Sequence, residues 1–381
     1  IRLGQTEPHQ VHSERPRHTL WRHHALSQNE TPGNYEGGTQ QFTKDQARFR
    51  EEKELRLTIL DAVKARINVS AITQEDKTKK LLKGSWSDFN YEFSNTHFFY
   101  PINFTNSYFG ASSNFSGVTF TGYADFSGAI FTEASFSGAE FTKNAGFFRA
   151  EFAKHTDFTE VTFIGNATFS EVKFAQSANF SKAKLTEDAD FSGAEFTEDA
   201  SFSETIFTKA SFSETIFTKA SFSGAEFTQN ANFSGAEFTQ NANFSEAEFT
   251  KDAHFSRAEF TEASFSRAKF TGYADFSEAK FTQNADFSET IFTEDTHFSG
   301  VAFTEASFSG ATFEEKPIFE RTLGDKTYKA RFSGKADPKD YNFKVSHNSP
   351  YKIETEEKEY DGAKFIIPKG TELFDPDETS E

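Results

Sequence analysis

The sequence predicts an all-β solenoid, in which short strands stack as successive coils along one axis. Three observations predict it. A unit centred on Phe recurs every five or six residues from Phe104 to Phe319, 51 of the 381 residues are Phe, and Ala nearly always stands two positions before the Phe. Near-identical segments cannot each occupy a different niche of one globular core, whereas stacked coils give like residues like surroundings.

The repeat contains two kinds of unit. It has 41 centres, of which only Leu185 is not Phe; 25 of the 40 intervals are five residues long and 15 are six. Ten of the 15 six-residue intervals follow a centre succeeded by Thr; the other five begin at Phe109, Phe152, Phe163, Phe174 and Phe313, which occupy the same alternate place in the repeat. One kind of unit is therefore fixed at five residues and the other varies.

The order of residues within a unit predicts a short strand followed by a turn. Residues two apart share one face of an extended chain, so in Ala124-Asp125-Phe126 the Ala and Phe face one way and Asp125 the other. A helix is excluded because a Phe spacing of 5 to 5.5 does not follow a period of 3.6. The expected inward-facing core includes Phe126, Phe169, Phe191, Phe202, Phe222, Phe233, Phe244, Phe255, Phe276, Phe287, Ala124, Ala189 and Ala231.

The motif Ala-(Asp/Asn)-(Leu/Phe)-x-x resembles that of pentapeptide-repeat proteins. Ala189-Asp190-Phe191-Ser192-Gly193 matches it directly, and the resemblance covers residues 86–320. It implies a right-handed quadrilateral β-helix with four units per coil, hence about ten coils, and a rod about 50 Å long at roughly 4.8 Å per coil. Six-residue units depart from the family pattern, and we interpret the extra residue as a bulge at a corner that leaves the inward Ala and Phe in register.

The segments before the repeat predict a leader and a cap. Residues 1–40 are expected to be a disordered leader; their five His residues have irregular spacing and no acidic or Cys partner, so a metal site is not favoured. Residues 41–85 are expected to form a helical N-terminal cap over the end of the solenoid, in preference to a partner-binding helix. The five His residues are His9, His12, His18, His23 and His24.

Two helices are expected within this cap. The first spans 43–67, with Thr43 and Gln46 as a capping box, and its apolar face is predicted to hold Leu55, Ile59, Ala62 and Val63. The second is expected to begin at Thr73 and end at Gly84.

The end of the chain loses the repeat. Residues 321–381 are expected to form a C-terminal cap followed by an acidic tail from Asp375. Within this region, residues 360–365 echo one repeat unit, and the run from Phe365 to Pro368 predicts a strand.

Composition narrows the classes of function. The absence of Cys excludes disulfides, thiolate metal sites and a cysteine nucleophile. No apolar run is long enough for a membrane-spanning helix, and the first thirty residues lack the apolar core of a signal peptide, which favours a cytoplasmic protein. The chain does not begin with Met, so Ile1 is either a processed terminus or the start of a fragment.

Charge is concentrated in the repeat. The chain carries a formal net charge of −18, and residues 104–319 hold 31 acidic against 14 basic side chains. Such a rod is expected not to bind nucleic acid directly, because phosphates repel it. The candidate acidic interaction surface comprises Glu195, Glu226, Glu237, Glu248 and Glu259.

The sequence predicts no catalytic, cofactor or metal site, because Ser, Asp and Glu recur indistinguishably and His155, His254 and His297 occupy ordinary outward positions. We therefore expect a non-enzymatic scaffold or interaction module with an unidentified protein partner. The alternative, which the family resemblance suggests, is a mimic of DNA that binds DNA gyrase and gives quinolone resistance. Grouping the centres by four argues against it, since one outward stack would run Ile206, Glu226, Glu248, Lys269, Ile291.

A third function, ice binding, is the least favoured. The Thr that follows Phe forms one predicted stack, which includes Thr208, Thr228 and Thr250, whereas an ice-binding face needs two aligned columns of Thr. The plainer interpretation is that Ser and Thr stabilise the turns.

Overall fold

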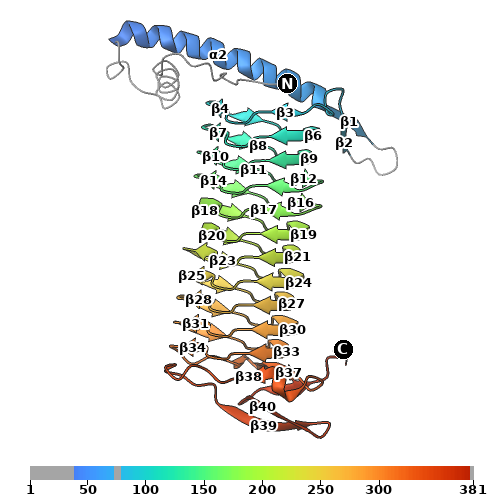
Figure 1. Ribbon diagram of the computed structural model, residues 1–381, viewed down its shortest axis with the longest axis vertical. Coiled ribbons are helices and arrows are strands. Elements are labelled where there is room, and N and C mark those ends of the chain that lie inside the picture. The colour runs from blue at the N-terminus through green and yellow to red at the C-terminus, as the bar shows by residue number, and fades with distance from the viewer. Residues whose placement is uncertain (1–37, 73–78, 378–381) are drawn as a thin grey trace, which may run out of the picture.

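The computed structural model describes residues 38–72 and 79–377. They form a rod of about ten stacked β-coils, with one helix, α2 (Gly38–Ile67), across its N-terminal end and β-hairpins at its C-terminal end (Figure 1). The predicted all-β solenoid with a helical N-terminal cap is therefore confirmed. Residues 1–37 of the expected leader, with its five His residues, lie outside the described residues, whereas residues 38–40 belong to the start of α2 and are not part of a disordered leader.

Two parallel sheets run the length of the rod on opposite sides of it (Figure 1). Sheet 1 has 19 strands: β4 (His97–Phe98), β5 (Ile102–Asn103), β7 (Thr119–Phe120), β8 (Ala124–Asp125), β10 (Glu140–Phe141), β11 (Ala145–Gly146), β14 (Thr162–Phe163), β15 (Ala167–Thr168), β18 (Lys184–Asp190), β20 (Ile206–Ser211), β22 (Glu226–Phe227), β23 (Ala231–Asn232), β25 (Glu248–Phe249), β26 (Ala253–His254), β28 (Lys269–Phe270), β29 (Ala274–Asp275), β31 (Ile291–Phe292), β32 (Thr296–His297) and β34 (Thr312–Phe313).

Sheet 2 has 16 strands: β3 (Tyr91–Glu92), β6 (Tyr108–Asn114), β9 (Ile130–Ser135), β12 (Glu151–Phe152), β13 (Thr156–Asp157), β16 (Lys173–Phe174), β17 (Ala178–Asn179), β19 (Glu195–Ser201), β21 (Ile216–Ser221), β24 (Glu237–Asn243), β27 (Glu259–Ser264), β30 (Lys280–Asp286), β33 (Ala302–Ser307), β37 (Arg331–Ser333), β38 (Tyr341–Asn342) and β41 (Glu372–Phe374).

The register shows how six-residue units fit beside five-residue units. Where β18 pairs with β20, Leu185 lies opposite Phe207; the register then shifts, and Ala189 lies opposite Ala210. The same register shift occurs where β19 pairs with β21. The extra residue is thus a bulge that returns Ala to its register, which confirms the interpretation of the six-residue units.

The two kinds of corner explain why only one of them varies in length. At the Phe-Ser corners a β-turn closes, as where the Ala129 N–H donates to the Phe126 carbonyl at 3.0 Å. The third residue of this turn, Gly128, has a φ of +65°. A hydrogen-bonded turn has a fixed number of residues. The structure shows no such bond at the Phe-Thr corners of the repeat, so these corners can accept one more residue.

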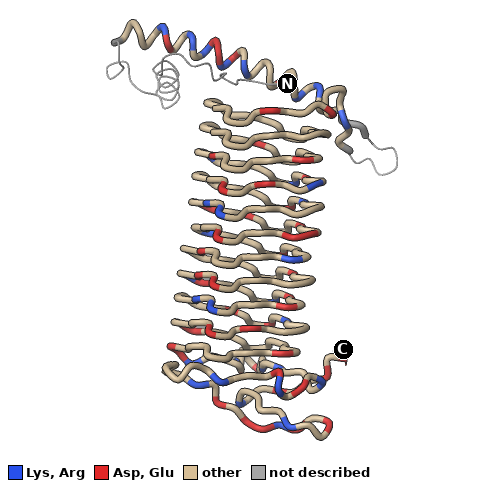
Figure 2. Tube along the Cα trace, viewed as in Figure 1, with Lys and Arg blue, Asp and Glu red and all other residues tan. Residues whose placement is uncertain are grey.

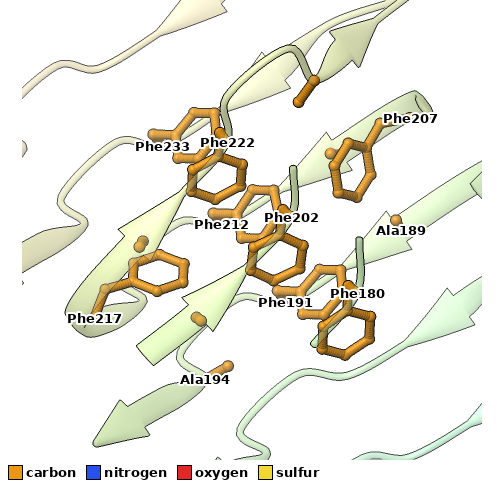
Figure 3. Packing of buried hydrophobic residues seen from close by; sticks show 14 of the residues in the cluster. Phe180, Ala189, Phe191, Ala194, Phe202, Phe207, Phe212, Phe217, Phe222 and Phe233 are labelled. Carbon is orange, nitrogen blue, oxygen red and sulfur yellow. The ribbon is translucent and has the colours of Figure 1, made fainter. Parts of the chain in front are cut away.

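The core consists of stacked phenyl rings. Every predicted core Phe has an exposed fraction of 0 %, and Ala124, Ala189 and Ala231 have 0–2 %. Phe222 stacks on Phe244 one coil below with centroids 4.8 Å apart and planes within 2°. Across the axis, Phe233 meets Phe244 edge to face at 5.3 Å, and Figure 3 shows this alternation of stacked and edge-to-face rings. Both geometries suit the ring quadrupole.

Leu185 interrupts one ladder of rings, between Phe163 above and Phe207 below. Elsewhere in the same ladder Phe227 and Phe249 stack at 4.8 Å, so the slot has the dimensions of a phenyl ring. We expect Leu185→Phe to raise the thermal midpoint by about 2–4 °C, because two ring contacts of about 0.5–1 kcal/mol are gained. Circular dichroism melting measures it, with Leu185→Ala as the destabilised control; a lower midpoint for Leu185→Phe would contradict it.

The helix α2 covers the first coil with one apolar face. Leu60, Val63 and Ile67 are buried and belong to the same core cluster as Tyr91 and Phe93. Lys64 beside them donates to Asn103 Oδ1 at 2.5 Å and Thr105 Oγ1 at 2.9 Å. The helix therefore seals the end of the phenyl ladders.

The expected helix face and capping box are partly wrong. Leu55 is 63 % exposed, because the face that docks is set by the spacing of Leu60, Val63 and Ile67 and Leu55 points away from it. Thr43 is no N-cap, since the helix begins at Gly38 and the Thr43 hydroxyl donates to the Thr39 carbonyl within it.

The second expected helix, from Thr73 to Gly84, is also wrong. Residues 79–83 form strand β2 (Lys79–Lys83), which pairs antiparallel with β1 (Asn68–Ile72), and residues 73–78 lie outside the described part. Strand β2 brings the chain back to the end of α2, where the Gly84 N–H donates to the Ile67 carbonyl. A Cβ on Gly84 would lie 2.0 Å from the Arg66 carbonyl oxygen, so tertiary packing sets this conformation over local helix preference.

At the C-terminal end the coil pattern continues beyond the last repeat. Phe332 of β37 pairs with Phe303, and Phe343 stacks below Phe308 at 5.9 Å. Two antiparallel hairpins and a short 3₁₀ helix complete this end: β35 (Glu320–Leu323) with β36 (Lys326–Lys329), β39 (Thr355–Tyr360) with β40 (Ala363–Pro368), and η2 (Pro338–Asp340).

Two expectations for the C-terminal region have different outcomes. The predicted strand from Phe365 to Pro368 is confirmed as part of β40. Residues 360–365 are not a coil unit, because Asp361 and Gly362 both have positive φ and form the hairpin turn. Asp375, where the acidic tail was expected to begin, pairs with Lys335 at 3.1 Å.

Candidate functional site

The outward residues directly before each Phe form two columns on each sheet, and the predicted glutamates lie in one of the two columns of each sheet. On sheet 1 the register runs Ile206, Glu226, Glu248, Lys269, Ile291, as the sequence predicts. On sheet 2 it runs Lys173, Glu195, Ile216, Glu237, Glu259, Lys280. The structure therefore divides the five predicted glutamates between two opposite faces instead of gathering them into one surface.

Cations interrupt both columns. On sheet 2, Glu195 pairs with Lys173 at 3.2 Å and Glu259 with Lys280 at 2.6 Å. These side chains are about half exposed, so each pair contributes at most about 1 kcal/mol. Their effect is to offset the repulsion that identical stacked carboxylates would otherwise produce.

The Phe-Ser corners carry a second set of paired charges. Arg149 donates to Glu171 one coil below at 2.6 Å. Arg267 lies between two carboxylates, 3.0 Å from Glu289 and 3.8 Å from Glu246. Figure 2 shows acidic and basic residues intermixed along the rod. The surface therefore has a net negative charge, but acidic and basic side chains are intermixed along it.

A family model described as "Pentapeptide repeats (9 copies)" matches residues 93–140, 104–151, 180–225, 222–269 and 265–312. The chain belongs to the pentapeptide-repeat family. No curated protein matches the chain.

In this pentapeptide-repeat protein, the polar residue between Ala and Phe supports the turn. The Ser234 N–H donates to Asn232 Oδ1 at 3.0 Å, and the Ser127 N–H donates to Asp125 Oδ1 at 2.9 Å. These side chains satisfy a backbone donor at the corner. Part of the hydrogen-bonding capacity of these carboxylate and amide side chains is therefore already used to stabilise the turns.

The Thr residues of the predicted stack likewise form hydrogen bonds between adjacent coils. Thr228 lies below Thr208, and its hydroxyl donates to the Phe207 carbonyl of the previous coil at 3.3 Å. Thr271 does the same to Phe249 at 3.1 Å. Because these hydroxyls bond the wall of the solenoid, they favour the turn-stabilising interpretation over an ice-binding face.

The three His residues of the repeat region differ in environment. His155 is exposed and His254 half-buried, but His297 is only 8 % exposed because a later segment of the chain covers it. His297 occupies the expected outward position, in register with Asp275, but unlike an ordinary outward residue it is buried. The covering segment lies beyond the repeat, so periodicity could not have revealed this burial.

The described residues contain neither a cluster suited to a metal ion nor a helix suited to a membrane. No group of three or more His, Asp or Glu among residues 38–72 and 79–377 is placed to hold a metal ion. In that same part of the chain no helix has both the length and the apolar character needed to cross a membrane.

Proposed function

We propose that this pentapeptide-repeat solenoid is a non-enzymatic scaffold that binds a protein partner along its repeated, charge-paired surface. The observation that carries the proposal is a long column of outward residues on each sheet, Ile206 to Ile291 on sheet 1 and Lys173 to Lys280 on sheet 2, in which acidic, basic and apolar side chains follow one another from coil to coil. A surface of this kind offers many equivalent contacts and suits avidity or spacing more than a single reaction.

A duplication supports a role that depends on repetition. Residues 203–212 and 213–222 are identical in sequence. They place Ile206 in β20 of sheet 1 and Ile216 in β21 of sheet 2. The duplicated unit is therefore half a coil, and it repeats the same outward side chains on both faces.

DNA mimicry remains the alternative, favoured by the net charge of the repeat region. A protein that mimics DNA needs a continuous track of negative charge like that of a duplex. The cations and isoleucines within both columns count against it. The assay is DNA supercoiling by gyrase with stoichiometric protein: the scaffold predicts unchanged supercoiling, and inhibition would favour the mimic.

Substitution of one face tests the scaffold directly. We expect a triple variant of sheet 2, Glu195→Thr, Glu237→Thr and Glu259→Thr, to lose a partner retained from host lysate by the immobilised wild-type chain. Thr is suitable because Thr119, Thr162 and Thr312 occupy the same outward position on sheet 1. The same substitution on sheet 1, Glu226→Thr with Glu248→Thr, shows whether the partner contacts one face or both. A lysate that yields no specifically retained protein, or equal retention by all three chains, would contradict the proposal.

A further inference from the structure

A cleft lies at the C-terminal end of the rod, and we call it the C-terminal cleft. Its volume is about 790 Å³, which is in the range of small-molecule sites. One wall is the last rung of sheet 1 and the start of β35, residues 316–322, with His297 beside it; the other is made by residues 352–354 and 368–370.

Backbone hydrogen bonds hold both walls in place. Ile318 continues the ladder of sheet 1, because the Phe298 N–H donates to its carbonyl at 2.7 Å and its own N–H donates to Thr296 at 2.9 Å. In the opposite wall, the Lys369 N–H donates to the Glu354 carbonyl at 2.9 Å. Both walls are therefore tied to the rest of the fold by backbone hydrogen bonds, although residues 316–317, 352–354 and 369–370 themselves lie outside strands.

The lining combines an apolar base with an excess of positive charge. Four cations, Lys316, Arg321, Lys352 and Lys369, face two carboxylates, Glu320 and Glu354. This balance reverses the strongly acidic character of the repeat. The apolar part of the lining consists of Pro317, Ile318, Phe319, Ile353 and Pro368.

Two of the cations are free to bind a ligand. Lys369 lies 3.9 Å from Glu354, and Lys352 donates to the Ser346 and His347 carbonyls. Lys316 and Arg321 are exposed and form no ion pair with any carboxylate in the described part of the chain. An anion is the ligand that would complete their electrostatics.

His297 adds a polar group to the same lining. It is 8 % exposed, and its Nδ1 has no hydrogen-bond partner among the described residues. Burial, and after it the charge of Arg321, lower the pKa of His297, so the ring is neutral near pH 7. Buried polar atoms without a partner are rare, and a buried water commonly supplies the missing bond.

We propose that the C-terminal cleft binds a small organic anion, with a carboxylate or phosphate held by Lys316 and Arg321 and an apolar body packed against Ile318, Ile353 and Pro368. This inference does not depend on the scaffold function, since it concerns the end of the rod and not its sides. It assigns the C-terminal region a ligand in addition to its role as a cap.

Calorimetric titration of the full chain with 1-naphthyl phosphate and 1-naphthoate tests this proposal, with the neutral 1-naphthol as the control ligand. We expect at least one aryl anion to bind at least tenfold more tightly than 1-naphthol; the tighter anion identifies whether phosphate or carboxylate is preferred. Added KCl should weaken anion binding to the wild-type chain, because the attraction is screened.

The variant Lys316→Gln with Arg321→Gln should weaken anion binding at least tenfold. Lys344→Gln, an exposed lysine outside the cleft, is the matched control and should leave it unchanged. Equal affinity for 1-naphthol and the anions, no saturable binding at millimolar ligand, or full affinity in the double variant would each overturn the proposal.

Discussion

Replacing Phe233 with aspartate should unfold the coils around it. The ring has an exposed fraction of 0 % and stacks on Phe212 at 4.8 Å and on Phe255 at 4.9 Å. It also meets Phe222 and Phe244 edge to face at 5.3 Å. Loss of a buried Phe costs about 3–5 kcal/mol, and a buried carboxylate without a partner adds a further penalty of several kcal/mol.

Circular dichroism melting and hydrogen exchange measure this effect. We expect the thermal midpoint to fall sharply and amide protection to be lost first between Phe212 and Phe255, because each coil is stabilised mainly by its neighbours. Exchange that stays slow in these coils would show that the carboxylate is accommodated and would contradict the packing argument.

The neighbouring residue provides the matched control. Asn232 points outward, and Asn232→Ser should be nearly neutral because Ser211 already occupies the same position one coil above. A Ser at this kind of position still accepts a turn N–H, as where Ser223 donates to Ser221 Oγ at 3.4 Å. Equal melting of the Phe233 and Asn232 variants would refute the assignment of inward and outward faces.

The repeat could be predicted from the sequence because its local pattern and its tertiary contacts carry the same information. Alternation of Ala, a polar residue and Phe sets the inward face, and stacking of identical units sets the neighbours. The bulge was also predicted, since the extra residue falls between the Phe or Leu centre of one unit and the Ala position of the next, as between Leu185 and Ala189. When the local sequence pattern and the tertiary contacts agree in this way, the fold can be predicted from the sequence.

The caps and the cleft could not be predicted in the same way, because each depends on a contact that occurs only once. The hairpin β1–β2 forms against the end of α2, although residues 79–83 alone would permit a helix. His297 is buried by a segment that begins some twenty residues later. The charge pairs were predictable in part. Arg149 and Glu171 are 22 residues apart, which is the length of one coil, so the repeat alone indicates that they lie in adjacent coils.

Removing one whole coil should leave the fold intact. Deletion of residues 234–255 joins Phe233 to Ser256, and Phe233 then takes the place of Phe255 above Phe276. All four ladders of side chains close again: Phe222 meets Phe265, and Phe217 meets Phe260. We expect one cooperative transition and a midpoint only a few degrees lower, because stability is roughly a sum of coil and interface contributions.

Removing a quarter of a coil should instead disrupt the rod, although far fewer residues are lost. Deletion of residues 234–238 joins Phe233 to Thr239 and moves every later unit by one face. Hydrogen-bonded Phe-Ser turns would then lie on bulged Phe-Thr corners, and bonds between turns such as Gly224 N–H to the Ser245 carbonyl could not form. Melting and limited proteolysis of the two deletions side by side decide the matter. If the five-residue deletion melts as the 22-residue one does, the two kinds of corner are interchangeable and the account of the variable unit fails.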